Sequence, residues 1–412
     1  MFEEKYKKIL LITIFVIITI FFGYLLYKLF FAPAKEPVAT TPKATTTETG
    51  GFPYADTGKG QIITEEGEVQ PLKEIVDKIP AKESAIANGN LTQTTEISKA
   101  NSFGSALSGN GSSINYYNKN DNKFYTISKN NEITELSNKQ FYNVEKVTWA
   151  PNKNKAIIEY PDGANIIYNF ETEKQITLPA HWKNFDFSST GDEIVMKSMG
   201  LDPENRWLAI TNEDGSKVQA IESLGAKDAT VYPSWSPNNQ SVAMYTEGKD
   251  FDRQEVFFVG LNNENFKSTI VEGRGFEPKW QPDGKRLLYS VYSNKNNMKP
   301  NLWIVDAQGE DIGQNRKSLN LETWANKCSF GSADTLYCAV PENLPEGAGL
   351  FPELAENTRD RLYKIDTKTG IKKLLATTKE SYNMTNLIIS ENEYNLYFTD
   401  QTTGIIHKIK LK

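Results

Sequence analysis

Histidine and cysteine are nearly absent from this chain, with two of each among 412 residues. So few of these side chains leave little material for a metal site or for histidine-dependent catalysis. His181 and His407 stand apart in the sequence. The sequence also lacks a Gly-x-Ser-x-Gly elbow, a P-loop, a Rossmann fingerprint, a His-Glu-x-x-His motif and an EF-hand loop. We therefore expect no cofactor, no metal and no catalytic residues, and we predict that the protein is not an enzyme.

An excess of positive charge is lacking as well. Lys and Arg total 46 against 52 Asp and Glu, which gives a net charge of −6 and a pI near 5.4. No local Lys/Arg cluster compensates for this balance, so the electrostatic footprint of a nucleic-acid-binding protein is missing. We expect no nucleic-acid partner.

One long apolar run stands at the N-terminus. Residues 1–8 are short and charged, and Ile9–Tyr27 is then 19 residues without a formal charge. At 1.5 Å per residue, this run spans roughly 28 Å, about one hydrocarbon core. We predict a single transmembrane helix over 9–31, with residues 1–8 in the cytoplasm and the remainder in the periplasm or at the cell surface. The alternative is a cleaved signal peptide with its cleavage site near Ala32–Ala34, which would also export the rest of the chain.

A linker follows the apolar run. Residues 32–88 are rich in Thr, Pro and Gly and have too little apolar content to pack, which predicts a flexible, solvated tether. Within it, Leu72–Ile79 has apolar residues at helical spacing and predicts a short helix over 72–79 that ends at Pro80. A transient helix within the tether is the alternative.

The remainder is organised by a repeated stretch. Trp280–Tyr289 (WQPDGKRLLY) indicates an aromatic strand end, a Pro-Asp-Gly turn and a new strand, because Pro presets the turn and Gly supplies a positive φ. An apolar anchor with the next apolar residue seven positions later recurs through the chain, with one copy shorter by a residue. The seven anchors, separated by 42, 38, 48, 45, 50 and 59 residues, are Leu107, Trp149, Phe187, Trp235, Trp280, Phe330 and Ile389.

A repeat of about 40–50 residues with four short strands per unit, here a to d, is typical of a β-propeller. We predict an all-β, monomeric, seven-bladed propeller of four-stranded antiparallel blades over 89–412, because each sheet needs a neighbour on both faces. The last unit, Met384–Lys412, contains only strands a to c, and Leu91–Ile97 resembles the d strands elsewhere. Residues near 90–96 are therefore expected to complete the seventh blade. A three-stranded last blade is the alternative.

The two cysteines can be placed on this scheme. If Phe330 faces Leu336 across the shortened turn, Cys328 faces Cys338 within disulfide range. Export would permit oxidation. Such a bridge closes a small loop and gains little entropy, so two buried free thiols remain the alternative.

Strand direction determines which connections share a face of the ring. The b–c and d–a connections emerge on one face, the loop face, and the a–b and c–d turns on the other. The loop face carries the long connections, and long loops on a rigid scaffold are where binding usually resides. Arg and Trp most often anchor protein interfaces. The candidate partner-binding residues are therefore Trp182, Arg206, Arg253, Arg274 and Trp324. The alternative is that each Trp packs on a blade rim and each Arg pairs with a loop carboxylate, such as Asp252 or Glu255.

The stretches Trp235–Asn239 and Trp280–Lys285 resemble the WD-like repeats of the TolB-like β-propeller family. The resemblance covers about residues 90–412 and implies the propeller architecture. The Tol-system propeller implies a periplasmic protein–protein role, with partners at the mouth of the ring. The whole chain also resembles membrane-anchored propeller proteins of bacteria. It departs from the Tol protein because a tether and a membrane span stand in place of a small α/β domain.

These features together predict a membrane-tethered, extracytoplasmic, non-catalytic propeller that binds a protein or peptide through its loop face. A ligand or glycan sensor that uses aromatic side chains such as Trp182 and Trp324 is the alternative. A propeller enzyme is a third possibility. A peptidase of the prolyl-oligopeptidase type would need a hydrolase domain after the last blade, and a lyase would need inward-facing His, Arg and metal-binding carboxylates. An exposed apolar, Arg-rich rim would favour a protein partner, whereas a channel lined by aromatics and acids would favour a ligand.

Overall fold

The computed structural model describes residues 15, 17–23, 61–63, 69–71, 82–332 and 334–412. The predicted cytoplasmic segment 1–8 and the predicted helix 72–79 lie outside these residues, as do most of the predicted span 9–31 and most of the predicted linker 32–88. Residues 15 and 17–23 are helical. In the described part of the chain, no helix combines the length and the apolar character needed to cross a bilayer.

The chain divides into two compact units, Met1–Asp77 and Lys78–Lys412. In the first unit, β1 (Gln61–Ile63) pairs antiparallel with β2 (Val69–Pro71). These two short strands lie within the region that the sequence predicts to be a linker.

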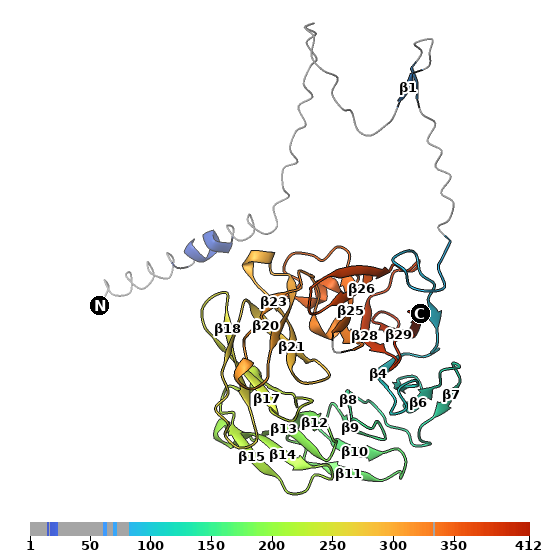
Figure 1. Cartoon of the computed structure of the whole chain (residues 1–412). Helices are drawn as coiled ribbons and strands as arrows, with labels where there is room; N and C mark the ends of the chain where they lie inside the picture. Colours follow the sequence, from blue (N-terminus) through green and yellow to red (C-terminus); the bar gives the residue numbers. More distant parts are fainter. Residues whose placement is uncertain (1–14, 16, 24–60, 64–68, 72–81, 333) are drawn as a thin grey trace, which may run out of the picture. The chain divides into compact units, whose positions relative to one another are not determined.

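The second unit is a ring of seven four-stranded antiparallel sheets, so the predicted seven-bladed propeller is confirmed (Figure 1). We number the blades 1 to 7 along the chain. The first strands of most neighbouring blades contact one another, as β4 contacts β8 and β28. The strands of blades 1 to 3, in order from the centre outwards, are β4 (Ser102–Leu107), β5 (Ile114–Asn118), β6 (Lys123–Ile127) and β7 (Ile133–Glu135); β8 (Lys146–Trp149), β9 (Lys155–Glu159), β10 (Asn165–Asn169) and β11 (Gln175–Leu178); and β12 (Trp182–Phe187), β13 (Glu193–Met199), β14 (Arg206–Asn212) and β15 (Gln219–Ser223).

Blades 4 to 6 repeat this plan, and the outer strand of blade 7 comes from the start of the propeller. The strands of blades 4 to 7 are β16 (Val231–Pro233), β17 (Ala243–Gly248), β18 (Gln254–Val259) and β19 (Thr269–Val271); β20 (Arg274–Trp280), β21 (Arg286–Tyr292), β22 (Pro300–Asp306) and β23 (Lys317–Ser318); β24 (Cys328–Phe330), β25 (Thr335–Pro341), β26 (Asp360–Asp366) and β27 (Lys372–Ala376); and β28 (Met384–Ile389), β29 (Asn395–Asp400), β30 (Ile406–Lys410) and β3 (Thr95–Glu96).

Short 3₁₀ helices lie in several of the connections. They are η1 (Pro203–Asn205), η2 (Asp228–Thr230), η3 (Asn294–Asn296), η4 (Gly309–Asp311), η5 (Ala325–Lys327) and η6 (Pro352–Ala355).

The repeated anchor marks the end of the inner strand in most blades. Trp280 is the last residue of β20 and lies directly opposite Leu287, the predicted first apolar residue of the next strand. Gly284 closes the turn between them with a φ of +69°, where a Cβ atom would lie 2.7 Å from the backbone nitrogen of Asn238. The anchors that end an inner strand are Leu107, Trp149, Phe187, Trp280, Phe330 and Ile389. The exception is Trp235, which follows β16 by two residues.

Ring closure occurs as predicted. β3 pairs antiparallel with β30, with Thr95 opposite Lys408 and Glu96 opposite His407. The Ile97 N–H donates to the Ile406 carbonyl (2.9 Å), and the Ile97 side chain is buried between blades 7 and 1. The chain reaches the ring before residue 89, because Ala87 is buried and its N–H donates to the Lys410 carbonyl (2.9 Å).

Apolar burial lies between the blades. Each neighbouring pair of blades, including 7 and 1, shares a cluster of buried side chains. Between blades 5 and 6 this cluster contains Cys328 and Cys338, which face each other on β24 and β25 and form a disulfide, with their Cα atoms 4.1 Å apart. A closed ring of such interfaces leaves no blade with an uncovered apolar face.

Candidate binding site at the mouth of the ring

Exposed apolar side chains gather in the b–c connections of the loop face. Leu201, between β13 and β14, is 98% exposed, and Phe251, between β17 and β18, is 74% exposed. Three more, Leu350, Phe351 and Leu354, lie in the long connection between β25 and β26. Exposed apolar side chains also occur in turns of the opposite face, such as Val218 and Ile371, but among the described connections of the ring only the b–c connection between β25 and β26 carries three of them within five residues.

The long connection over 342–359 is held in place by hydrogen bonds on both sides. The Gly347 and Gly349 N–H groups donate to the carbonyls of Asn297 (2.9 Å) and Met298 (2.8 Å) in blade 5. On the other side, the Asn383 amide donates to the Ala355 carbonyl (3.0 Å) and the Glu356 carbonyl (2.8 Å). The loop is therefore attached to blades 5 and 7 as well as to its own blade.

The structure places two of the predicted contact residues within the framework of blade 3. Trp182 is the first residue of β12, is 4% exposed and packs between blades 2 and 3. Arg206 is the first residue of β14, pairs with Asp228 (2.9 Å) and donates from Nε to the Gly200 carbonyl (3.2 Å). Trp182 thus packs against the blades, which was the alternative to a role in partner binding.

Arg253 and Arg274 come together around a single loop. Arg253 is exposed and donates from Nε to the Asp250 carboxylate (2.7 Å), rather than to Asp252 or Glu255. Arg274 donates from Nε to the Phe251 carbonyl (3.2 Å) and also hydrogen-bonds to the Asp250 carbonyl. Both guanidinium groups therefore stabilise the loop that presents Phe251.

Trp324 lines a pocket of about 440 Å³ on the loop face, which we call the mouth pocket. Blades 5 and 7 contribute to it through their inner strands, at Glu277 and Thr385, and blade 6 contributes through η5 and the long connection. Its lining residues are Glu277, Trp324, Asn326, Lys327, Pro352, Ala355, Glu356, Asn383, Thr385 and Gln401. Pockets of this size commonly hold small ligands or single side chains of a partner.

Glu277 supplies a carboxylate to the mouth pocket. It lies on β20, and its Oε1 accepts a hydrogen bond from the Asn326 N–H (2.8 Å). Burial raises the pKa of Glu277, against the opposing effects of that N–H and of Lys279. Lys279 lies two residues further along β20, where burial lowers its pKa to about 8, and it donates to the Cys328 carbonyl.

A buried ion pair forms the floor of the pocket. Lys327 Nζ lies 2.7 Å from Asp360 Oδ2 and donates to Asn383 Oδ1 (2.6 Å). The Met384 N–H donates to the same Asp360 oxygen (2.6 Å). Burial lowers the pKa of Lys327 and raises that of Asp360, while their close contact opposes both shifts. Both members of the pair belong to blade 6, and the hydrogen bonds to Asn383 and from Met384 connect the pair to blade 7. Loss of one member of such a pair typically costs about 3–5 kcal/mol.

Sequence reasoning found Trp324 but missed the charged residues beside it. A signal for them exists, because Glu277 and Lys327 both stand three residues before an apolar anchor, Trp280 and Phe330. Alternation along a strand places that position on the side of the strand opposite the anchor's own side chain. Polar residues also occupy this position in other repeats, as at Lys146.

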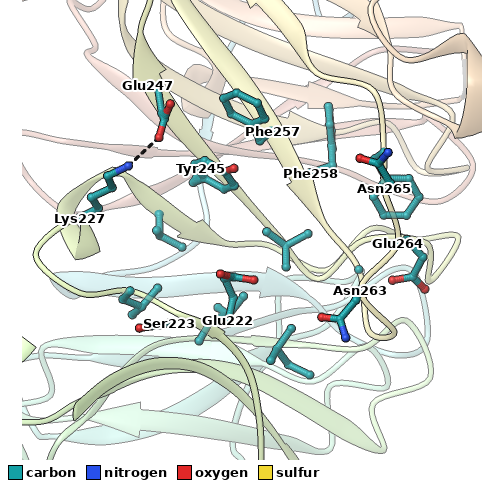
Figure 2. A pocket seen from close by; sticks show the side chains of 17 residues that line it. Glu222, Ser223, Lys227, Tyr245, Glu247, Phe257, Phe258, Asn263, Glu264 and Asn265 are labelled. Carbon is teal, nitrogen blue, oxygen red and sulfur yellow. Dashed lines mark hydrogen bonds and ion pairs between the residues drawn. The ribbon is translucent and has the colours of Figure 1, made fainter. Parts of the chain in front are cut away.

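A second pocket, of about 390 Å³, lies between blades 3 and 4 and away from the centre (Figure 2). Tyr245 and Phe257 stack there with ring centroids 4.7 Å apart. Lys227 pairs with Glu247 (2.7 Å), and the carboxylates of Glu222 and Glu264 also line the pocket. Stacked aromatics beside carboxylates are chemically suited to a polar ligand with apolar faces, such as a sugar.

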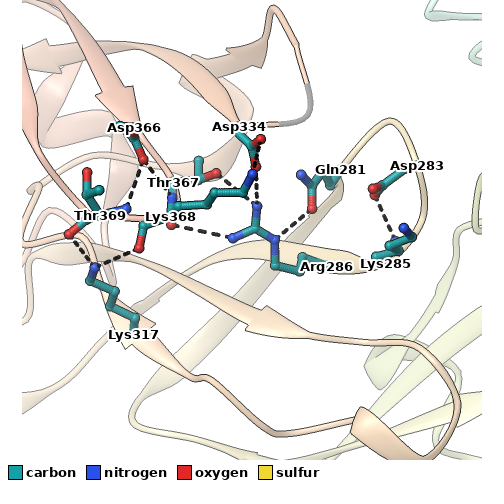
Figure 3. A network of polar contacts seen from close by, with 10 residues as sticks. All are labelled: Gln281, Asp283, Lys285, Arg286, Lys317, Asp334, Asp366, Thr367, Lys368 and Thr369. Carbon is teal, nitrogen blue, oxygen red and sulfur yellow. Dashed lines mark hydrogen bonds and ion pairs between the residues drawn. The ribbon is translucent and has the colours of Figure 1, made fainter.

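The turns on the opposite face contain a polar network between blades 5 and 6 (Figure 3). Arg286 donates to Gln281 Oε1 (2.9 Å), to Thr367 Oγ1 (3.0 Å) and to Asp334 (3.2 Å), and Lys368 also pairs with Asp334 (2.7 Å). Because these groups satisfy one another, we interpret the network as a connection between blades.

Comparisons with known proteins show the fold. No family model and no curated protein matches the sequence. An oligogalacturonate lyase in complex with manganese matches with a TM-score of 0.55 at 14% identity, over 78% of this chain and 93% of that one. The Cps50 (Swd1) β-propeller domain of Myceliophteria thermophila matches with a TM-score of 0.51 at 11% identity, over 78% of this chain and 100% of that one. Among the residues that the structure describes, no three His, Cys, Asp or Glu side chains are placed to hold a metal ion.

Proposed function

We propose that this protein is a non-catalytic binding module whose loop face takes a protein or peptide partner. The observation that carries the proposal is the set of exposed apolar side chains in the b–c connections, above all Phe351 and its neighbours Leu350 and Leu354. They project from a connection that hydrogen bonds hold to three blades. A preformed surface of this kind loses little conformational entropy on binding.

Charge and pocket geometry support a protein as the partner. Arg253 and Arg274 lie beside the exposed Phe251, and the mouth pocket lies beside the long connection that carries Phe351. Aromatic and Arg side chains around a pocket are typical of the anchor regions of protein interfaces.

We further propose that the propeller acts outside the cytoplasm, attached to the membrane by its N-terminal segment. The uncharged run Ile9–Tyr27 and the Cys328–Cys338 disulfide support this placement, since disulfides persist mainly in oxidising compartments. The WD-like repeats support kinship with TolB-like propellers, whose role would be similar.

A sugar sensor is the second candidate. The stacked Tyr245 and Phe257 with the carboxylates of Glu222 and Glu264 favour it (Figure 2). This pocket lies between two blades rather than in the central channel, and the exposed apolar side chains of the b–c connections would have no role in sugar binding.

Photocrosslinking in the native host tests the leading proposal. A photoreactive amino acid replaces Phe351 on the loop face. The matched control replaces Ile371, which lies in the c–d turn of the same blade on the opposite face and is 69% exposed. We expect a discrete protein adduct at position 351 and none at 371.

A second substitution makes the result specific. Leu354→Glu places a charge beside Phe351 and should abolish the adduct at position 351 without altering the fold, because Leu354 is exposed. Adducts at both positions, or at neither in a correctly folded protein, would contradict a protein partner on this face and move the proposal towards the sugar sensor.

A further inference from the structure

The carboxylate of Glu277 has no cationic partner in the mouth pocket. Among the described residues, no Lys, Arg or His nitrogen lies within 4.0 Å of it, and its Oε2 accepts no hydrogen bond. Lys279 is the nearby cation, but its ammonium group hydrogen-bonds to the Cys328 carbonyl. Lys279 acts on the carboxylate only through its field, without direct contact. A half-buried carboxylate that forms no ion pair favours the arrival of a cation, which would restore the lost solvation.

The positive charge of the pocket is already compensated. Lys327 is 6% exposed, and both Asp360 and Asn383 hold its ammonium group. An anionic ligand would therefore find no free ammonium group in the pocket. Glu356 on the rim is exposed and adds a second carboxylate. The charge that remains available to a ligand is negative.

Apolar groups beside the carboxylate suit the stem of a long basic side chain. Trp324 lines the pocket together with Pro352 and Ala355. An indole ring attracts ammonium and guanidinium groups through its π-face, and the methylene stem of Lys or Arg packs well on apolar walls. The combination distinguishes a basic side chain from a simple metal cation.

We propose that the mouth pocket binds a Lys or Arg side chain of the protein partner, with Glu277 as its counter-ion and Trp324 as its wall. This inference rests on the proposed function and gives the partner its chemistry. The anchor is a basic residue that projects from the partner and enters the ring from the loop face. The exposed apolar side chains of Phe351 and its neighbours then contact the partner around that anchor.

Short peptides test the pocket without the partner. The full-length protein is titrated by calorimetry with four capped tripeptides, Gly-Xaa-Gly, in which the central residue is Lys, Arg, norleucine or Glu. We expect millimolar or tighter binding of the Lys and Arg peptides, and at least tenfold weaker binding of the norleucine and Glu peptides. Equal binding of the Glu peptide, or no binding of either basic peptide, would overturn the inference.

Glu277→Gln gives the residue-level test. It keeps the acceptor for the Asn326 N–H and removes the charge, and we expect about tenfold weaker binding of the basic peptides, the loss of one charge-assisted contact. The matched control is Glu145→Gln, which removes an exposed carboxylate near blade 2 and outside the mouth pocket. This substitution should leave the binding of all four peptides unchanged. If Glu277→Gln does not fold, the selectivity of the wild-type protein among the four peptides still decides.

The outcomes separate this inference from the proposed function. An adduct at position 351 without binding of basic peptides would retain the protein partner and reject the basic anchor. Binding of basic peptides that Glu277→Gln leaves unchanged would reject the role of Glu277. Binding that depends on Glu277 but occurs without any adduct at position 351 would retain the pocket and reject the protein partner.

Discussion

Asp186 connects blades 3 and 4 through its carboxylate. The Trp235 N–H donates to Oδ2 (2.8 Å) and the Phe187 N–H to Oδ1 (3.0 Å), so the side chain joins blade 3 to blade 4. Burial raises the pKa of Asp186 to about 6, against the opposing effects of these N–H donors and of Lys146 and Lys153. The carboxyl group is thus ionised at neutral pH at a cost in stability.

This position makes stability depend on pH in a defined direction. Between about pH 4 and pH 6, the folded protein holds a proton on Asp186 that the unfolded chain releases, so the free energy of unfolding falls as pH rises. The fall amounts to at most roughly 3 kcal/mol. In Asp186→Asn, which retains an acceptor oxygen, we expect this component of the pH dependence to disappear. Urea unfolding of both proteins at several pH values measures the pH dependence of the free energy of unfolding.

The exposed turn residue Asp162 provides the control, since Asp162→Asn should keep the wild-type pH dependence. If the free energies of unfolding of wild type and Asp186→Asn change in parallel between pH 4 and pH 6, Asp186 does not titrate in this window.

For single residues, the sequence indicated which types of side chain stand on the loop face, but it did not indicate which of them are exposed. Trp182 and Trp324 both stand in d–a connections, yet Trp182 begins β12 and turns into the core whereas Trp324 lines a pocket. Whether such a Trp is buried depends on the residue at which the inner strand begins, and the local sequence pattern does not determine that residue. The ion pair between Lys327 and Asp360 joins residues 33 positions apart, and only the pairing of β24, β25 and β26 brings them together.

At the element scale, β3 closes the ring. It is only two residues long, but the chain beside it buries Ile97 between blades 7 and 1 and pairs with β30. Closure through a strand from the start of the propeller joins the two ends of the ring and gives blade 7 its fourth strand.

Ile97→Ala should therefore destabilise the whole ring rather than a local segment. Loss of a buried Ile side chain typically costs about 2–5 kcal/mol, and here it weakens the contact that closes the circle. We expect a lower urea midpoint for the entire cooperative unfolding transition, which tryptophan fluorescence monitors. Glu96→Ala, an adjacent and exposed position on β3, should have little effect. An unchanged midpoint in Ile97→Ala would mean that the strand is dispensable.

The regular part of the fold could be predicted from sequence because the repeat encodes it locally. A strand end, a Pro/Asn/Gly turn and a new strand recur with nearly constant spacing, and the structure keeps that register, as in Trp280 opposite Leu287. The long connection over 342–359 could be recognised as unusual but not positioned. Its place depends on hydrogen bonds to Asn297, Met298 and Asn383, which lie in two other blades.

At the scale of the whole molecule, the disulfide in the ring bears on the cellular compartment of the protein. Cys328 and Cys338 are both fully buried and lie directly opposite each other, with a sequence separation of 10. Closure of so small a loop contributes between about 2 and 3 kcal/mol in the chain-entropy account. The bridge is adjacent in sequence to the mouth pocket, because Cys328 directly follows Lys327, which lines that pocket.

The redox state of this pair in living cells therefore tests where the propeller is located. Cells are quenched with acid, and the unfolded protein is treated with a maleimide polymer that adds mass to each free thiol. In an oxidising compartment, we expect no mass increase without a reductant and two additions after reduction. A Cys328→Ala variant, with one free thiol, serves as the control and should show one addition without reduction. Two additions to the unreduced wild-type protein would place the propeller in a reducing compartment, and the proposal of an extracytoplasmic binding module would then be wrong, whatever the loop face binds.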